Sequence, residues 1–161
     1  MRRAGPDPTE QDLRSPSWCR GPSVADMDLK LSHCFVTVHD IDLALTFYRD
    51  VLELDVHTDA TMDGFRWVTV SPRAQPQIEI GLMDPRMGPG AADADAVLAL
   101  SAKGALNAVI FTSEDVDADF DKIRAAGAEV LQEPVDQPYG VRDCAFRDPS
   151  GNMIRLSSPR H

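Results

Sequence analysis

Two stretches of the chain decide its fold: His33–Val56, HCFVTVHDIDLALTFYRDVLELDV, and Ala108–Val130, AVIFTSEDVDADFDKIRAAGAEV. Both have the pattern of an apolar strand, an acidic turn, an amphipathic helix and the start of a second strand. Asp40 in the first copy corresponds to Asp115 in the second, 75 residues further along the chain. The sequence therefore predicts one structural module that occurs twice.

Each copy continues through further strand patterns, so the predicted order of elements in a module is β-α-β-β-β. In the first copy we expect a strand over 33–38, a helix over 41–52 and strands over 56–61, 65–71 and 77–83. In the second copy we expect a strand over 106–112, a helix over 115–126 and strands over 129–132, 139–147 and 152–157. A short helix over 93–103 is expected between the two copies.

The domain organisation follows from this repeat. Residues 1–28 are rich in Pro, Gly, Ser and charge without a sustained period, which predicts a disordered N-terminal tail. Met27 directly precedes the first strand pattern and is a candidate start of translation. Residues 29–160 are expected to form a single domain, with module one over 29–84, a linker and short helix over 85–104, and module two over 105–158. Neither module is long enough to bury a large core alone, so we expect the two to pack together.

Charge and composition narrow the classes of partner. The net charge of -10 argues against nucleic acid and anionic membrane surfaces, which attract clustered Lys and Arg. No apolar run has the length of a membrane span, and no secretory signal pattern opens the chain. Cys19, Cys34 and Cys144 form no CxxC pair, which indicates reduced thiols in a cytoplasmic protein.

Several motifs resemble those of a known family. In the first copy they are His33-x-x-Val36-x-Val38-x-Asp40 and Phe47-Tyr48-x-x-x-Leu52. In the second copy the main motif is Phe146-Arg147-Asp148-Pro149-Ser150-Gly151-Asn152. Across residues 30–157 the chain resembles the vicinal oxygen chelate superfamily, which includes glyoxalase I, bleomycin resistance proteins and extradiol dioxygenases. The resemblance implies an α+β fold in which two βαβββ modules form a U-shaped cavity of mixed sheets, with the helices packed outside.

The resemblance also implies where a metal would bind. In metal-using members the ligands come from the first and fourth strands of each module, and His33 and Glu79 fall at these positions in module one. Their counterparts in module two are Ala108, which has no donor atom, and Arg155, which is a permanent cation. Because a catalytic metal needs about three protein ligands, the site is only partial and no cofactor is favoured. A divalent metal (Ni, Zn, Fe or Mn) is the alternative, and a Glu79–Arg155 ion pair is another interpretation of the same residues.

Strand alternation identifies the residues that line the cavity. The apolar side chains Cys34, Val36 and Val38 suit the face that packs on the helix, so the residues between them face the cavity. Trp67 and Thr69 share one face of the third strand, whereas His39 and His57 lie at strand edges and are expected to be exposed. The predicted ligand-binding residues are His33, Phe35, Thr37, Trp67, Glu79 and Arg155.

These observations favour a small-molecule binding protein of the glyoxalase and bleomycin resistance type. Arg155 would recognise an anionic group of an organic ligand, because guanidinium forms bidentate bonds to carboxylate and phosphate. The alternative is an enzyme: a metal-dependent lyase, isomerase or dioxygenase that uses His33 and Glu79, or a metal-free enzyme with Glu79 as catalytic base. The resemblance further implies a homodimer, with modules paired within one chain or between two.

Overall fold

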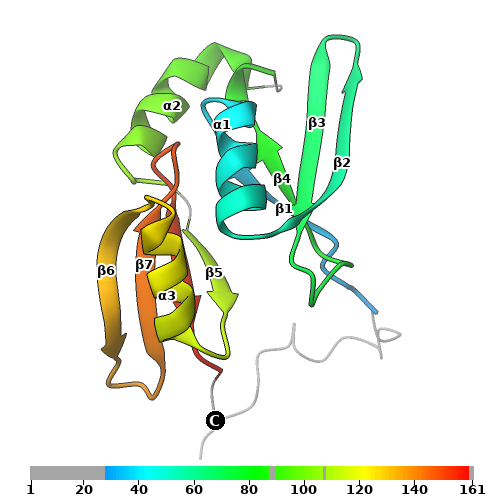
Figure 1. The fold of residues 1–161 in the computed structure, drawn as a ribbon. Coiled ribbons are helices and arrows are strands. Elements are labelled where there is room, and N and C mark those ends of the chain that lie inside the picture. The colour runs from blue at the N-terminus through cyan, green and yellow to red at the C-terminus, as the bar shows by residue number, and fades with distance from the viewer. Residues whose placement is uncertain (1–27, 88–89, 107, 160–161) are drawn as a thin grey trace, which may run out of the picture. The chain divides into compact units, whose positions relative to one another are not determined.

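The computed structural model describes residues 28–87, 90–106 and 108–159, and Leu31–His161 form one compact unit. The disordered tail predicted for residues 1–28 lies almost entirely outside the described residues. The compact unit contains two four-stranded sheets with one helix packed on each, joined through a third helix (Figure 1). No helix in the described part of the chain is long and apolar enough to cross a membrane.

Module one has the predicted β-α-β-β-β order. Its elements are β1 (His33–Thr37), α1 (Ile41–Leu45), the π-helical segment η3 (Thr46–Val51), β2 (Asp55–Met62), β3 (Phe65–Ser71) and β4 (Glu79–Met83). The strands lie in the order β1-β4-β3-β2, with β1 parallel to β4 and the other pairs antiparallel. The sheet is therefore mixed.

Module two repeats this topology after a short linker. The linker contains the 3-10 turns η4 (Pro85–Met87) and η5 (Ala91–Asp93) and the helix α2 (Ala94–Ala102). The module contains β5 (Ala108–Thr112), α3 (Val116–Ala125), β6 (Glu129–Asp136), β7 (Arg142–Arg147) and β8 (Met153–Ser157). Its strand order is β5-β8-β7-β6, again with one parallel pair. The prediction of an α+β fold with two βαβββ modules is confirmed.

The acidic residue repeated between the two copies begins a helix in each module. The Asp40 side chain accepts hydrogen bonds from the backbone N–H groups of Asp42 and Leu43, at 2.9 and 3.0 Å. Asp115 accepts one from the backbone N–H of Ala118 at 3.0 Å. These bonds satisfy donors that have no partner inside the helix, so the sequence repeat is a repeat of helix caps.

The helix predicted over 41–52 changes form halfway. After α1, the backbone N–H of Leu52 donates to the carbonyl of Phe47, five residues back, at 3.0 Å. This wider turn places the adjacent side chains Phe47 and Tyr48 both in the interior, with their rings edge to face at 5.4 Å. Regular α-helical spacing would turn one of two adjacent residues further from the core.

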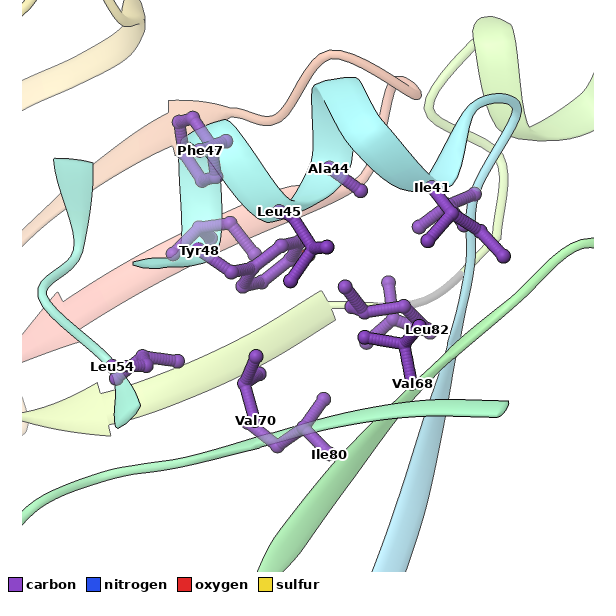
Figure 2. Close-up of a cluster of buried hydrophobic side chains, with 13 residues drawn as sticks. Ile41, Ala44, Leu45, Phe47, Tyr48, Leu54, Val68, Val70, Ile80 and Leu82 are labelled. Carbon is purple, nitrogen blue, oxygen red and sulfur yellow. The ribbon is translucent and has the colours of Figure 1, made fainter. Parts of the chain in front are cut away.

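The module one core lies between α1 and one face of its sheet. Apolar side chains from the helix point toward those of β3 and β4, and Tyr48 and Val70 are fully buried (Figure 2). Residues of module two join the same cluster, because Ile154 is buried in it and Val109 packs against it. The two modules therefore share apolar packing, as their small size predicts.

The turn Asp148–Asn152 connects the two modules with polar bonds. Tyr48 donates its hydroxyl hydrogen to the Asp148 carboxylate at 2.9 Å, and both side chains are buried. Asn152 donates to the Thr37 carbonyl at 2.8 Å, and the backbone N–H of His39 donates to the Ser150 hydroxyl at 3.0 Å. The sequence motif at this turn thus holds module two against module one.

Candidate functional site

The face of the module one sheet that does not pack on α1 carries the candidate site, and we call it the open face. It carries His33 and Phe35 from β1, Trp67 and Thr69 from β3, and Glu79 from β4. Phe35 on this face is 45% exposed, whereas its neighbour Val36, on the other face of β1, is 1% exposed. Strand alternation therefore separates a core face from an open face in this sheet.

Glu79 is the centre of the polar part of the open face. Its Oε2 atom accepts a hydrogen bond of 2.6 Å from the hydroxyl of Thr69, which is fully buried. The same oxygen lies 3.6 Å from Nε2 of His33, and the β1–β4 ladder pairs these two residues directly. Glu79 is itself mostly covered, with 17% of its side chain exposed. The carboxylate is thus held in place by a buried hydroxyl and approached by an imidazole.

His57 also belongs to the site, although the sequence predicted only an exposed strand edge there. Its Nδ1 lies 3.3 Å from Glu79 Oε2, and half of its side chain is exposed. The β2–β3 register shifts between Val56 and Thr58, so His57 is the extra residue of a β-bulge. A bulge changes the direction of a side chain relative to strict alternation, which explains why the two-residue period did not identify His57.

The apolar part of the open face is aromatic. The Trp67 ring centroid lies 5.7 Å from that of Phe35, 6.2 Å from that of Phe65 and 6.5 Å from that of His33. The Phe35 ring lies directly over Gly81, where an added Cβ would come within 2.5 Å of a ring carbon. A glycine on β4 therefore makes room for this ring, and the result is an aromatic surface beside a carboxylate.

Arg155 does not reach Glu79, and the predicted ion pair between them is wrong. Its Nη1 atom instead donates to Oδ2 of Asp143 at 2.7 Å, with 2% of the Asp143 side chain exposed. Burial alone would raise the pKa of Asp143, but hydrogen bonds from Gln137 and Gln132 and the charge of Arg155 together hold that pKa below its usual value. The guanidinium is consequently neutralised within module two.

The strand register explains this difference between the modules. Glu79 lies opposite His33 on β1, but the residue opposite Ala108 on β5 is Met153. Arg155 lies two residues further along β8, opposite Ile110. The predicted equivalence of Glu79 and Arg155 is therefore displaced by two residues in the ladder. Neither Ala108 nor Met153 offers a ligand that hard divalent metals prefer.

The donors that are present do not form a metal centre. Among the described residues, no group of three or more His, Cys, Asp or Glu side chains is arranged to hold a metal ion. His33 and His57 both approach Glu79 through one carboxylate oxygen, which also accepts from Thr69. This oxygen of Glu79 is thus already bonded to Thr69 and approached by both imidazoles.

Thr37 has a different environment from the rest of the predicted site. It ends β1 opposite Met83, and its carbonyl oxygen accepts the hydrogen bond from Asn152. By alternation its side chain shares a face with His33 and Phe35. The structure therefore places Thr37 at the edge of the open face, next to the connection between the modules.

The comparisons with known proteins agree with this architecture. A sequence model of the Glyoxalase/Bleomycin resistance protein/Dioxygenase superfamily matches residues 30–156. The chain belongs to this superfamily. Uncharacterized protein YurT from Bacillus subtilis (strain 168) is 30% identical over 129 residues, which cover 80% of this chain and 98% of that protein.

Two solved structures are similar to this chain in sequence and fold. The crystal structure of UcmS2 is 33% identical, with a TM-score of 0.74, and the match covers 81% of this chain and 98% of that one. TnmS3, an antibiotic binding protein from Streptomyces sp. CB03234, is 28% identical with a TM-score of 0.66, covering 83% and 99%. The family and fold predicted from the sequence are confirmed.

Proposed function

We propose that this superfamily member binds an aromatic organic molecule on the open face of module one and acts as a binding protein. The observation that carries the proposal is the aromatic surface beside the Glu79 carboxylate, in which Phe35 is exposed and Trp67 and Phe65 are half-buried. A soluble domain gains nothing in stability from aromatic side chains left in water, whereas ligand pockets are lined mainly by apolar and aromatic groups with a few polar ones. The similarity to a protein described as antibiotic binding supports the same class of ligand.

The anionic ligand expected from Arg155 is not part of this proposal. Arg155 is bonded to Asp143, and Gln132 lies 3.5 Å from its Nη1 atom. Asp143 therefore already neutralises the guanidinium. A ligand carboxylate that approached the remaining N–H groups of Arg155 would be repelled by Asp143 as well as attracted by Arg155, so the net attraction is small.

We further propose that the binding unit is a homodimer. On one chain the open face is a surface, since Phe35 is 45% and His33 39% exposed. A second copy that covered this face would convert the surface into an enclosed pocket, which binds small molecules more tightly than an open sheet.

Fluorescence of Trp67 provides the test of binding. The chain has two tryptophans, and a Trp18→Phe background leaves Trp67 as the only one. Aromatic antibiotics titrated into this variant should change its emission and saturate. Isothermal titration calorimetry of Trp67→Ala in the unaltered background should show binding weakened about tenfold, because loss of an aromatic contact and its buried area costs about 1 to 2 kcal/mol.

A matched control separates this effect from a general loss of apolar surface. Leu100 on α2 is 45% exposed and lies away from the open face, so Leu100→Ala should leave the affinity unchanged. Equal affinities for the unaltered protein and Trp67→Ala, with both folded, would rule out the open face as the binding surface.

A metal-dependent enzyme is the second candidate, and His57 is the observation in its favour. His57 adds a third possible metal ligand to His33 and Glu79, which are the two that the family pattern implies. The side chains as arranged do not fit a metal, so we assign no reaction step to one. Elemental analysis of protein purified without chelator distinguishes the candidates, because one bound Ni, Zn, Fe or Mn per chain would support the enzyme.

A further inference from the structure

Resting on the proposed function, we infer which class of aromatic ligand the open face selects. We propose that it binds aromatic cations, meaning planar ring systems that carry a protonated amine, and discriminates against aromatic anions. Three features lead to this inference: the state of the Glu79 carboxylate, the pairing of the nearby arginines and the chemistry of the aromatic surface.

The first feature is that Glu79 keeps acceptor capacity. The contacts from Thr69, His33 and His57 all involve Oε2. A carboxylate has about four lone-pair sites on its two oxygens, so Oε1 remains able to accept from a ligand. A ligand ammonium would form a charge-assisted hydrogen bond there, which is about twice as strong as a neutral one.

The second feature is that the neighbouring arginines of module one are already paired. Arg66 on β3 forms ion pairs with Asp59 at 2.9 Å and with Asp42 at 2.8 Å. Arg73 pairs with Asp55 at 3.1 Å. Each described arginine on or next to β3 is therefore matched by a carboxylate, so no unpaired guanidinium there offsets Glu79. The basic groups that face Glu79 are the imidazoles of His33 and His57, at 3.6 and 3.3 Å from its Oε2 atom, so an anionic ligand would have to compete with this carboxylate for them.

The third feature is the aromatic surface itself. The faces of Trp and Phe rings are negative and attract cations, and indole is the most effective of them. Trp67 lies at the centre of the aromatic group, within 6.5 Å of the His33 ring and therefore on the same side of the sheet as Glu79. A cationic ring system can stack on the aromatic group while its amine approaches the carboxylate.

The net charge of the whole chain also favours cationic ligands. A net charge of -10 attracts cations and raises their local concentration and association rate. This long-range effect is screened by salt, whereas a contact at Glu79 is screened much less. Measurements at two ionic strengths therefore separate attraction to the whole chain from selection at the open face.

The test compares three planar tricyclic probes that differ in charge. They are 9-(aminomethyl)anthracene, whose amine is protonated, 9-anthracenemethanol, which is neutral, and 9-anthracenecarboxylate, which is anionic. We expect the cation to bind at least tenfold more tightly than the anion in 0.15 M and in 0.5 M salt. Glu79→Gln keeps the shape of the side chain and removes its charge, so it should weaken cation binding about tenfold and bring the three affinities close together.

Asp95→Asn supplies the matched control. Asp95 is an exposed residue in the first turn of α2, so this variant loses one negative charge away from the open face. It should keep the preference for the cation. Circular dichroism of each variant verifies that the fold is retained before affinities are compared.

The possible results separate the two proposals. If the anion binds as tightly as the cation, or if Glu79→Gln keeps the preference, the inference about charge is wrong although the binding function stands. If none of the three probes binds, both the inference and the proposed aromatic binding site are wrong. Loss of the preference in Asp95→Asn as well would attribute it to net charge and overturn the role of Glu79.

Discussion

At the residue scale, the two modules differ most clearly at the ion pair between Asp143 and Arg155, which belongs to module two. Asp143 is almost fully buried and accepts from Gln132 and Gln137 as well as from Arg155. Asp143→Asn should lower the free energy of unfolding by about 3 kcal/mol at pH 7, because it leaves a guanidinium without its charged partner. Urea unfolding of the variant and the unaltered protein measures this loss.

The same pair predicts a pH dependence with a definite sign. Because the folded-state pKa of Asp143 lies below its usual value, the pair stabilises the protein above about pH 4 and ceases to do so as the pH falls through the folded-state pKa. The stability difference between Asp143→Asn and the unaltered protein should therefore shrink below pH 4. Asp136→Asn is the control, since Asp136 pairs with Arg142 at 3.2 Å but its side chain is 84% exposed. A difference that stays constant down to pH 3 would contradict this assignment.

At the element scale, the turn Asp148–Asn152 is the main polar connection between the modules. Asp148 accepts from the backbone N–H groups of Ser150 and Asn152, both at 2.8 Å. These bonds within the turn hold the carboxylate in the orientation in which it accepts from Tyr48. Burial and the Asp148 charge raise the pKa of Tyr48, which keeps its hydroxyl protonated and able to donate. Tyr48→Phe should destabilise the protein by about 2 kcal/mol, the value typical of a hydrogen bond to a buried charge.

Tyr139→Phe provides the comparison for Tyr48→Phe. Tyr139 also donates to a carboxylate, that of Asp143, but the bond is 3.3 Å long and the residue is 63% exposed. Its loss should be within the error of a urea unfolding experiment. Similar midpoints for both tyrosine variants would show that the turn at Asp148 does not fasten the modules.

At the scale of the whole molecule, the fold was predictable because its signals are periodic and occur twice. The alternation of Cys34 and Val36 with His33 and Phe35 identified the two faces of β1, and the Asp40 cap identified the start of α1. The site was predictable only in part. The place of His57 in the site depends on the β-bulge in β2, and no single residue in a sequence indicates that a bulge will form.

Arg155 shows a second limit of prediction from sequence. Its pairing depends on two features. Arg155 lies two residues further along the β5–β8 ladder than Glu79 lies along the β1–β4 ladder, and Asp143 from β7 is buried beside it. Both are consequences of tertiary packing. Alternation gave the correct face of each strand, but it does not specify which charged groups on that face meet.

The exposure of the two edge strands leads to a prediction about assembly. β1 and β5 each lie at the edge of a separate sheet, where unpaired backbone groups favour association with another chain. Ile110 on β5 is 65% exposed and Phe35 on β1 is 45% exposed, so burying both would stabilise a dimer.

Sedimentation at micromolar concentration should give twice the mass of the chain. Ile110→Asp should shift this equilibrium toward the monomer and weaken ligand binding in parallel, whereas Leu100→Asp, which alters an exposed leucine of α2, should do neither. A chain that sediments as a monomer yet binds ligand with full affinity would show that the open face of a single copy is the complete site.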